Sequence, residues 1–146
     1  MNIKIRDLKE QDLPHVLDIA KVSFSVPWSL EAFKSEIFNP NSILRIAELD
    51  GEIAGYIVLR KIIDQSELLS IAVKPGLRRK GIATELIKNV LNEIKSSIKC
   101  CFLEVRVSNF EAISLYEKIG FKKVGKRKNY YLLPKEDATV MKLDIV

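Results

Sequence analysis

The chain has 146 residues, of which 47% are hydrophobic and 29% are charged, and its formal net charge is +5. This length suits one domain that buries roughly two-thirds of its unfolded surface, and the composition excludes disordered and fibrous proteins. The first residues carry charges too early for a signal peptide, and no apolar run approaches the roughly 20 residues of a membrane span, so we expect a cytoplasmic protein.

The first half of the sequence predicts a strand, two helices and three strands. Apolar residues between Leu13 and Ala20 recur at helical spacing, and Pro27 breaks the chain after them. Ser29 is a good cap for the second helix. Two strands are joined at Asp50-Gly51, which is a strong hairpin signal. The predicted ranges are 3–6, 11–22, 29–38, 43–49, 52–60 and 67–73.

The second half contains the clearest periodicity. Apolar residues recur at helical spacing from Ile82 to Ile98 and predict a long amphipathic helix. The segment 99–107 is apolar on both faces until Glu104, which is typical of a strand in the middle of a covered sheet. A short helix over 109–119, with Gly120 as its C-cap, precedes two final strands, 122–132 and 138–143. We therefore expect one α/β domain over residues 1–146, with a mixed seven-stranded sheet and about four helices.

Cysteine and histidine are too few for metal chemistry. Cys100 and Cys101 are adjacent, and neighbours on a strand point to opposite faces, so we expect reduced, buried thiols. The single histidine, His15, is expected on the surface of the first helix. The sequence therefore predicts no metal site and no histidine-based catalytic triad.

Two basic clusters hold the excess positive charge. One consists of Lys74, Arg78, Arg79 and Lys80, and the other lies within residues 122–128. Such clusters suit the phosphates of a nucleic acid or of a nucleotide cofactor, although a charge run is more often a solvated face. Charge alone leaves these alternatives open.

The first cluster stands at the beginning of the long helix. Arg79 and Lys80 precede a turn whose unpaired backbone N–H groups and helix dipole already make the potential positive. Cations there cost a few tenths to about 1 kcal/mol each unless an anion is bound between them. Gly81 lets the backbone approach such an anion, and Ala83 adds little bulk. The segment fits neither common nucleotide-binding motif, and the alternative is a basic turn that happens to precede a core helix.

Two side chains are candidates for proton transfer. Burial on an apolar strand raises the pKa of a carboxyl group toward that of a general base, which makes Glu104 one candidate. Its alternative is an ion pair with Arg106, two residues on and on the same face of the strand. Tyr116 is the other candidate, although its ring can equally belong to the core. Glu104, Asn109 and Tyr116 fall within 13 residues, on a strand, a turn and a helix that can all face one cleft.

Four motifs in order resemble those of the GNAT superfamily of N-acetyltransferases. More narrowly, the pattern is similar to ribosomal-protein-alanine N-acetyltransferases and archaeal N-terminal acetyltransferases. The similarity covers nearly the whole chain, although Arg78 and Ala83 stand where close relatives often have Gln and Gly. The motifs are Ile71-Ala72-Val73, Arg78-x-x-Gly81-x-Ala83, Leu103-Glu104-Val105-Arg106-x-Ser108-Asn109 and Leu115-Tyr116-x-x-x-Gly120-Phe121, supported by Pro27-Trp28-Ser29 and Asn129-Tyr130-Tyr131.

The resemblance implies a GNAT domain that uses acetyl-CoA and assigns a role to each motif. Glu104 is expected to accept a proton and Tyr116 to donate one. The expected cofactor-binding residues are the backbone of Ile71, Ala72 and Val73, then Arg79, Lys80, Gly81, Ile82, Ala83 and Thr84 around the pyrophosphate, and Asn109. Phe24, Pro27, Trp28, Tyr130 and Tyr131 are expected to flank the peptide channel, although Trp28 can equally be a core anchor.

The expected function is direct acetyl transfer from acetyl-CoA to the N-terminal α-amino group of a protein, with a ribosomal protein as the implied partner. An α-amino group titrates near ~8 and a lysine near ~10.4, so a single carboxylate base suits a protein N-terminus better. The alternatives are a broad-specificity N-terminal, lysine or small-amine acetyltransferase of the same fold and, outside this class, a non-catalytic ribosome- or RNA-binding module.

Overall fold

Strand pairing in the computed structural model, which describes residues 2–145, produces one seven-stranded sheet of order β1-β2-β3-β4-β5-β7-β6. Only β4 and β5 are parallel, and every other neighbouring pair is antiparallel. This confirms the predicted mixed sheet. The strands are β1 Ile3–Asp7, β2 Ser42–Leu49, β3 Glu52–Ile62, β4 Gln65–Val73, β5 Cys100–Arg106, β6 Lys122–Leu132 and β7 Lys135–Asp144.

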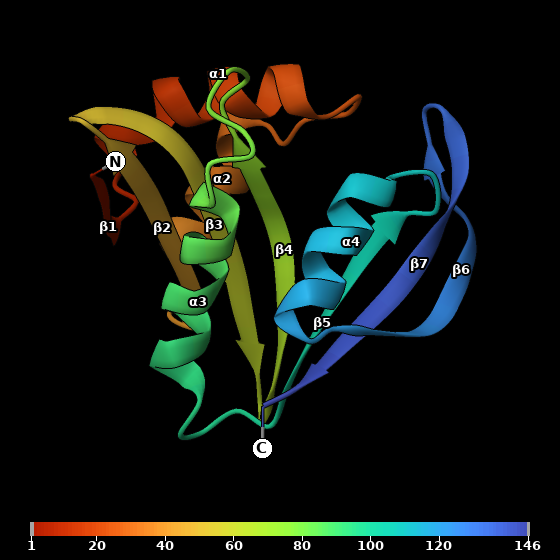
Figure 1. Ribbon diagram of the computed structural model, residues 1–146. Helices are drawn as coiled ribbons and strands as arrows, with labels where there is room; N and C mark the ends of the chain where they lie inside the picture. Colours follow the sequence, from red (N-terminus) through yellow and green to blue (C-terminus); the bar gives the residue numbers. More distant parts are fainter. Residues whose placement is uncertain (1, 146) are drawn as a thin grey trace.

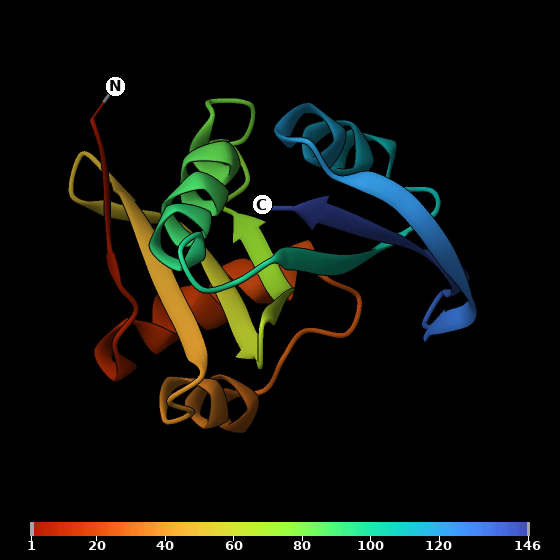
Figure 2. The ribbon, with the colours of Figure 1, turned by 90° about the horizontal axis from the view of Figure 1, so that it is seen from below.

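Two pairs of helices cover the two faces of the sheet. In Figure 2 the pair α3 and α4 lies on one side and the pair α1 and α2 on the other. The predicted caps are present: the Ser29 Oγ atom accepts a hydrogen bond from a backbone N–H at 3.1 Å, and Gly120 has a φ of 123°. Asn109 is a further cap, because its Oδ1 atom accepts a backbone N–H at 3.1 Å. The helices are α1 Leu13–Ser23, preceded by the 3-10 turn Glu10–Asp12, α2 Leu30–Ile37, α3 Ile82–Ile94 and α4 Phe110–Ile119.

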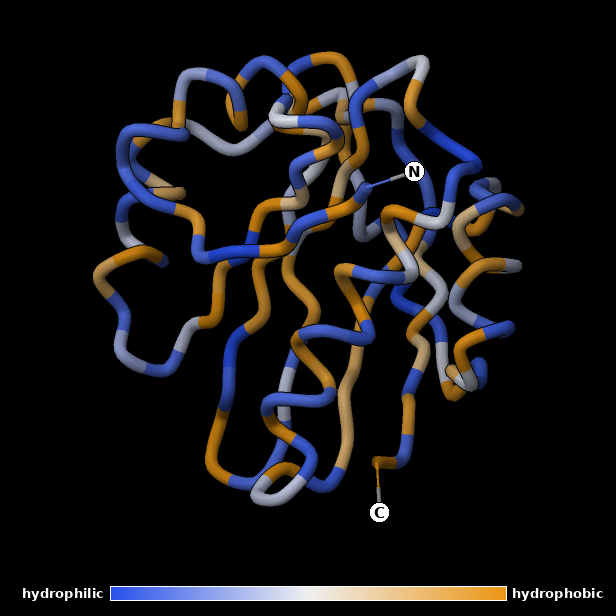
Figure 3. Tube along the Cα trace, turned by 60° about the vertical axis from the view of Figure 1, so that its left-hand side comes forward, coloured by the Kyte–Doolittle hydropathy of each residue, from blue (hydrophilic) through white to orange (hydrophobic). Residues whose placement is uncertain are grey.

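Each face has its own hydrophobic core. Leu86 and Val90 of α3 and Ile113 of α4 pack with Leu103 on one face. On the other face α1 and α2 pack on the alternate strand positions, where the Phe33 and Tyr56 rings stand 5.4 Å apart. Figure 3 shows apolar residues concentrated along the strands of the sheet. Burial of one large apolar side chain stabilises the fold by roughly 1.5–3 kcal/mol, so the apolar positions that recur along the helices and strands hold the layers together.

The parallel strands β4 and β5 pair only at their beginnings. Gln65 pairs with Cys100, and the last pair is Glu67 with Phe102. β4 then continues to Val73 and β5 to Arg106, but the two strands no longer pair with each other. Figure 1 shows their arrows separating toward the tips. The sheet is therefore open between these strands at their carboxyl ends.

The structure corrects several boundaries and confirms several smaller predictions. The last strand begins at Lys135 instead of residue 138, and the first helix begins at Leu13 after a 3-10 turn. The long helix ends at Ile94, because the chain turns at Ser96-Ser97, while Ile98 remains buried through a backbone hydrogen bond of 3.0 Å to Ile94. Cys100 and Cys101 are buried free thiols. His15 is exposed, as predicted. None of the helices within residues 2–145 is long and apolar enough to cross a membrane.

Candidate functional site

A β-bulge in β4 shapes one side of the opening. Val58 of β3 pairs with Ser70 but Leu59 pairs with Leu68, so Leu69 is an extra residue in β4. Beyond it the alternation is shifted: Ser70, whose hydroxyl bonds the Tyr56 hydroxyl at 2.8 Å, faces the α1 side. Ile71 and Val73 pack on the α3 side. Sequence reasoning missed this bulge, whose only signal is the adjacent pair Leu68-Leu69 in an otherwise alternating strand.

The beginning of α3 forms the second wall and leaves backbone donors free. Gly81, the N-cap, has a φ of 82° and offers no side chain to cap the helix. The N–H groups of the first turn, from Ile82 to Thr84, therefore have no intrahelical acceptor. Arg79 also has a positive φ, 62°, which few residues other than glycine adopt. The first turn thus presents amides with a favourable dipole for an anion.

Only half of the first basic cluster is free to meet such an anion. Lys74 forms an ion pair with Glu52, while Arg78 donates to the Val73 carbonyl at 3.0 Å and to Ser23 Oγ at 3.2 Å. Arg79 is 83% exposed, its nearest acidic partner being Glu111 at 3.7 Å, and Lys80 is exposed. The structure therefore leaves Arg79 and Lys80 as the exposed cations beside the α3 amides.

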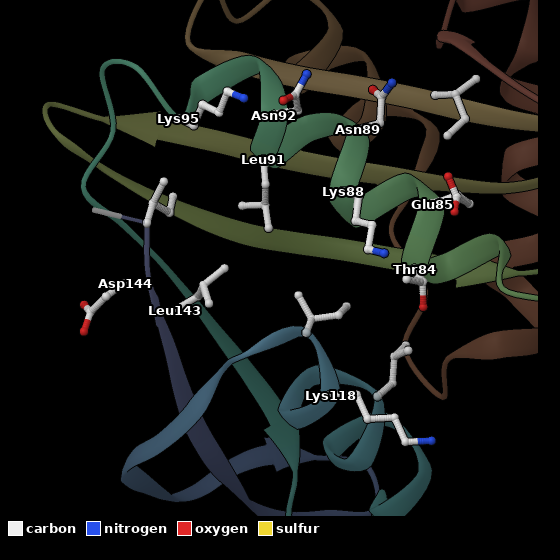
Figure 4. Close-up of a pocket in the computed structure, with 14 residues that line it drawn as sticks. Thr84, Glu85, Lys88, Asn89, Leu91, Asn92, Lys95, Lys118, Leu143 and Asp144 are labelled. Atoms are coloured by element: carbon white, nitrogen blue, oxygen red, sulfur yellow. The ribbon is translucent and has the colours of Figure 1, made fainter.

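A groove runs from this helix start between α3 and α4. Its volume is about 910 Å³, and Thr84 lines it at the end nearest the beginning of α3. Figure 4 shows Lys88 on α3 and Lys118 on α4 at the same end of the groove as Thr84. Sequence reasoning did not single out these two lysines. Lys88 is one helical turn after Thr84 and therefore lies on the same face of α3, which is the sequence signal that could have identified it.

Glu104 lies on the face of β5 that α4 does not cover. Its neighbours Leu103 and Val105 belong to the core under α4, so Glu104 points to the opposite side. Burial raises the pKa of its carboxyl group, the positive charge of Arg127 lowers it, and the negative charge of Glu67 raises it further. The Glu104 Oε1 atom is 3.3 Å from Arg127 Nε.

The alternative ion pair between Glu104 and Arg106 is wrong. Arg106 Nη1 is 3.2 Å from Glu136 instead and donates to the Pro134 carbonyl at 2.8 Å. The guanidinium reaches sideways because the β6–β7 hairpin offers it a carboxylate and two carbonyl acceptors, the second being Leu133. Arg106 therefore holds the hairpin against β5 and leaves Glu104 free for other partners.

Tyr116 borders the opening from the other face. Its ring belongs to the core under α4 and stands 5.9 Å from the Phe121 ring. Burial, followed by the proximity of Tyr131 and Cys101, raises the pKa of Tyr116 far above its usual range. The phenol is therefore protonated at neutral pH. Glu104 and Tyr116 approach the split from opposite faces of β5, whereas the sequence suggested that both could face one cleft.

Asn109 begins α4 at the rim of the same opening. Its side-chain oxygen accepts the Ala112 N–H at 3.1 Å. This commits the carbonyl half of the amide to the helix cap and leaves its NH₂ group as a donor. Asn109 itself is exposed.

The predicted peptide-channel residues come from the loop between α1 and α2 and from strand β6. Phe24 is 41% exposed and Pro27 is exposed, whereas Trp28 packs on Phe33 with ring centroids 5.1 Å apart, so its role as a core anchor is real. Tyr130 is about half exposed, and the Arg106 guanidinium lies 4.3 Å from the centre of the Tyr131 ring. Phe24 and Tyr130 are thus open to solvent, whereas Trp28 and Tyr131 are held by contacts with other side chains.

A second irregularity brings the two tyrosines into place. Arg127 pairs with Ala138 and Tyr131 with Glu136, so three residues of β6 stand opposite one residue of β7. Asn129 takes a φ of 53° there, and its N–H donates to Asp137 Oδ1 at 2.8 Å. Burial and the neighbouring Tyr130 raise the pKa of Tyr131 to about 12, so it is a neutral hydrogen-bonding group.

Comparisons of the sequence and of the structure with known proteins all find N-acetyltransferases. The acetyltransferase (GNAT) family model matches residues 13–121. The ribosomal protein bS18-alanine N-acetyltransferase of Escherichia coli (strain K12) is 33% identical over 144 residues, covering 97% of each chain. The N-alpha-acetyltransferase of Saccharolobus solfataricus is 31% identical over 151 residues, covering 94% of this chain and 90% of its own. A crystal structure of the ribosomal-protein-S18-alanine N-acetyltransferase from Escherichia coli superposes with a TM-score of 0.91 at 31% identity, covering 99% of this chain and 94% of the other.

Proposed function

The chain belongs to the GNAT family of acetyltransferases, and we propose that it acetylates the N-terminal α-amino group of a protein, with residues 1–146 acting as one catalytic domain. It is an acetyl-CoA-dependent N-acetyltransferase. The observation that carries the proposal is the split between β4 and β5, which joins the free amides of α3 on one face to Glu104 on the other. A cofactor and a peptide can therefore meet through the sheet.

The residues on the α3 side fit acetyl-CoA. A helix start without a side-chain cap and with two exposed cations suits a pyrophosphate, and the β4 edge that β5 leaves unpaired suits the amides of a pantetheine arm. We assign the pyrophosphate to Arg79, Lys80, Gly81, Ile82, Ala83 and Thr84, the arm to the backbone of Ile71, Ala72 and Val73, and a further contact to Asn109. Bound acetyl-CoA supplies the thioester that the substrate amine attacks.

Glu104 and Tyr116 would divide the proton transfers. The raised pKa of Glu104 suits a base that accepts a proton from the substrate ammonium, directly or through a water. The raised pKa of Tyr116 keeps its hydroxyl protonated, so it can donate that proton to the departing sulfur. The two groups approach from opposite faces, so Glu104 would act on the amine and Tyr116 on the sulfur without competing for one proton. Acetyl transfer would then occur directly within a ternary complex.

The relatives suggest the substrate. Proteins 33% identical to this chain are named for the alanine of ribosomal protein bS18, and we propose the same N-terminus here. Phe24, Pro27, Trp28, Tyr130 and Tyr131 would flank that peptide. With a ribosomal substrate, we propose a cytoplasmic location for the enzyme.

A second candidate is an N-terminal acetyltransferase of broad specificity. The similarity to the N-alpha-acetyltransferase of Saccharolobus solfataricus favours it, since that name specifies no single substrate protein. Both candidates use the same catalytic geometry and differ only in the residues accepted at the start of the peptide.

Acetyl transfer to matched peptides tests the proposal. Peptides that begin with Ala, Ser or Met are offered with free or blocked N-termini, each with one internal lysine, and products are located by mass spectrometry. We expect acetylation at the free α-amine only, fastest on the bS18 sequence. Equal rates on blocked peptides through lysine would refute N-terminal specificity, and equal rates on all free peptides would favour broad specificity.

A further inference from the structure

A second carboxylate, Glu67, lies beside Glu104 at the point where the sheet opens. Glu67 pairs with Phe102 in the last paired position of β4 and β5, and paired residues of parallel strands point to the same face. Glu104 is two residues beyond Phe102 and therefore shares that face. From ordinary strand spacing the Cα atoms of Glu67 and Glu104 are roughly 8 Å apart, close enough for both side chains to reach one small cation.

Among the described residues none forms a hydrogen bond or ion pair with the Glu67 carboxylate, which is partly buried, although the positive charge of Arg60 is near enough to interact with it. Arg60 is its cross-strand neighbour in β3, but the Arg60 guanidinium turns to Glu36 and bonds both of its oxygens. Lys142, which lies 5.6 Å from the Phe102 ring, pairs with Asp144 at 3.3 Å. A partly buried carboxylate that forms no ion pair of its own keeps its oxygens available for a cationic group of the substrate.

The charges around Glu104 show what such a cation would meet. Arg127 approaches from β6 at 3.3 Å, but its side chain is 59% exposed and can swing away. Tyr130, also from β6, has its pKa raised by burial and then by the negative charge of Glu104. Without Arg127, the carboxylates of Glu67 and Glu104 would give this part of the opening a net negative charge.

We propose that Glu67 is a positioning residue that binds the substrate's α-ammonium group and holds it in reach of Glu104. This rests on the proposed N-terminal acetylation. A protein N-terminus arrives largely charged below its pKa near ~8, so an anion that does not itself remove the proton is useful for binding. Arg127 would occupy the same place in the free enzyme and leave when the peptide binds.

The test compares Glu67→Gln with wild type on two ligands. One is an Ala-first substrate peptide, and the other is its des-amino analogue, which lacks the α-amine and acts as a competitive inhibitor. We expect the KM of the peptide to rise roughly 10-fold, the scale of one partly exposed bond to a charged group, with kcat at pH 8 nearly unchanged. The inhibition constant of the analogue should stay constant, because it has no ammonium to lose.

Two further variants separate this role from a structural one. Glu10→Gln removes the same charge from an exposed position outside the site and should change nothing. Glu67→Asp keeps the charge and should recover part of the affinity. Loss of the neighbouring negative charge should also lower the pKa of Glu104, so the acid limb of the pH profile of kcat should move to lower pH in Glu67→Gln.

The outcomes are distinct. An unchanged peptide KM in Glu67→Gln, or an equal weakening of the des-amino analogue, overturns the proposal. So does a large fall in kcat with constant KM, since Glu67 would then be a base. If wild type acetylates no free N-terminus at all, the proposed function fails first, whereas an active wild type with an unaffected Glu67→Gln variant removes only this inference.

Discussion

Replacing Glu104 with Gln removes the proposed base and little else. The Gln side chain has nearly the same size, and the one ion pair that it loses joins a quarter-exposed carboxylate to Arg127, which is 59% exposed. Such a pair is worth about 1 kcal/mol or less, which lowers the melting temperature of a chain of this length by at most about 4 °C. Removal of a general base costs about 100-fold or more in rate, or roughly 2.7 kcal/mol.

Steady-state kinetics with an Ala-first peptide, following release of the coenzyme A thiol, measures this effect. We expect kcat to fall by about 100-fold or more, while the dissociation constant of acetyl-CoA stays within twofold of wild type. Glu10→Gln, exposed and outside the site, serves as the matched control. Activity within threefold of wild type would remove Glu104 from the mechanism.

The pH profile gives an independent check. A base must be ionised to act, so the wild-type rate rises with pH through the pKa of Glu104. Because burial raises that pKa, the acid limb should lie above the ordinary carboxyl value near ~4.3. The limb should be absent in Glu104→Gln. A wild-type limb at or below ~4.3 would contradict the environment described for this side chain.

Four other changes probe the cofactor and the substrate sides. Tyr116→Phe keeps the buried ring and should lower kcat at least 10-fold with little change in either KM, measured by the same assay. Arg79→Ser with Lys80→Ser should weaken acetyl-CoA binding roughly 10-fold at low salt and less at high salt, measured by calorimetry. Gly81→Ala meets no atom within 4 Å but must hold φ at 82°, so it should cost about 1–2 kcal/mol in chemical denaturation. Arg106→Gln should loosen the β6–β7 hairpin and raise the peptide KM about fivefold, since it loses charged bonds to two carbonyl oxygens. A wild-type value in the measurement named for any of the four changes would contradict the role assigned to that residue.

The sequence predicted the fold well because its signals are local. Ser29 and Gly120 mark helix ends, and the Asp50-Gly51 turn joins β2 to β3 as expected. The end of α3 was missed because Ile98 continues the helical spacing, although the turn at residues 95–97 buries it by a different route. Periodicity reports which side of the chain is buried, and here two backbone conformations bury the same face.

The sequence suggested candidate residues for the site but could not give the geometry in which they meet. Nothing local in Arg78 says that it turns back to Val73 and Ser23 while Arg79 stays free. Likewise, Arg106 pairs with Glu136, which is 30 residues away in the sequence, and not with Glu104, which is two residues away. Such choices depend on which strands become neighbours, so they follow from the completed sheet rather than from spacing.

The opening of the sheet explains how the two proposed proton-transfer groups, Glu104 and Tyr116, can lie close in sequence and still act from separate faces. A continuous β4–β5 ladder would seal Glu104 on one face from Tyr116 on the other. Pairing stops at Glu67 and Phe102, so the two faces communicate only beyond that point. The peptide amine and the cofactor can then approach from opposite sides, which favours direct transfer over a covalent acetyl-enzyme. The two cysteines fit this reading, since both are buried and burial raises the pKa of the Cys101 thiol to about 11.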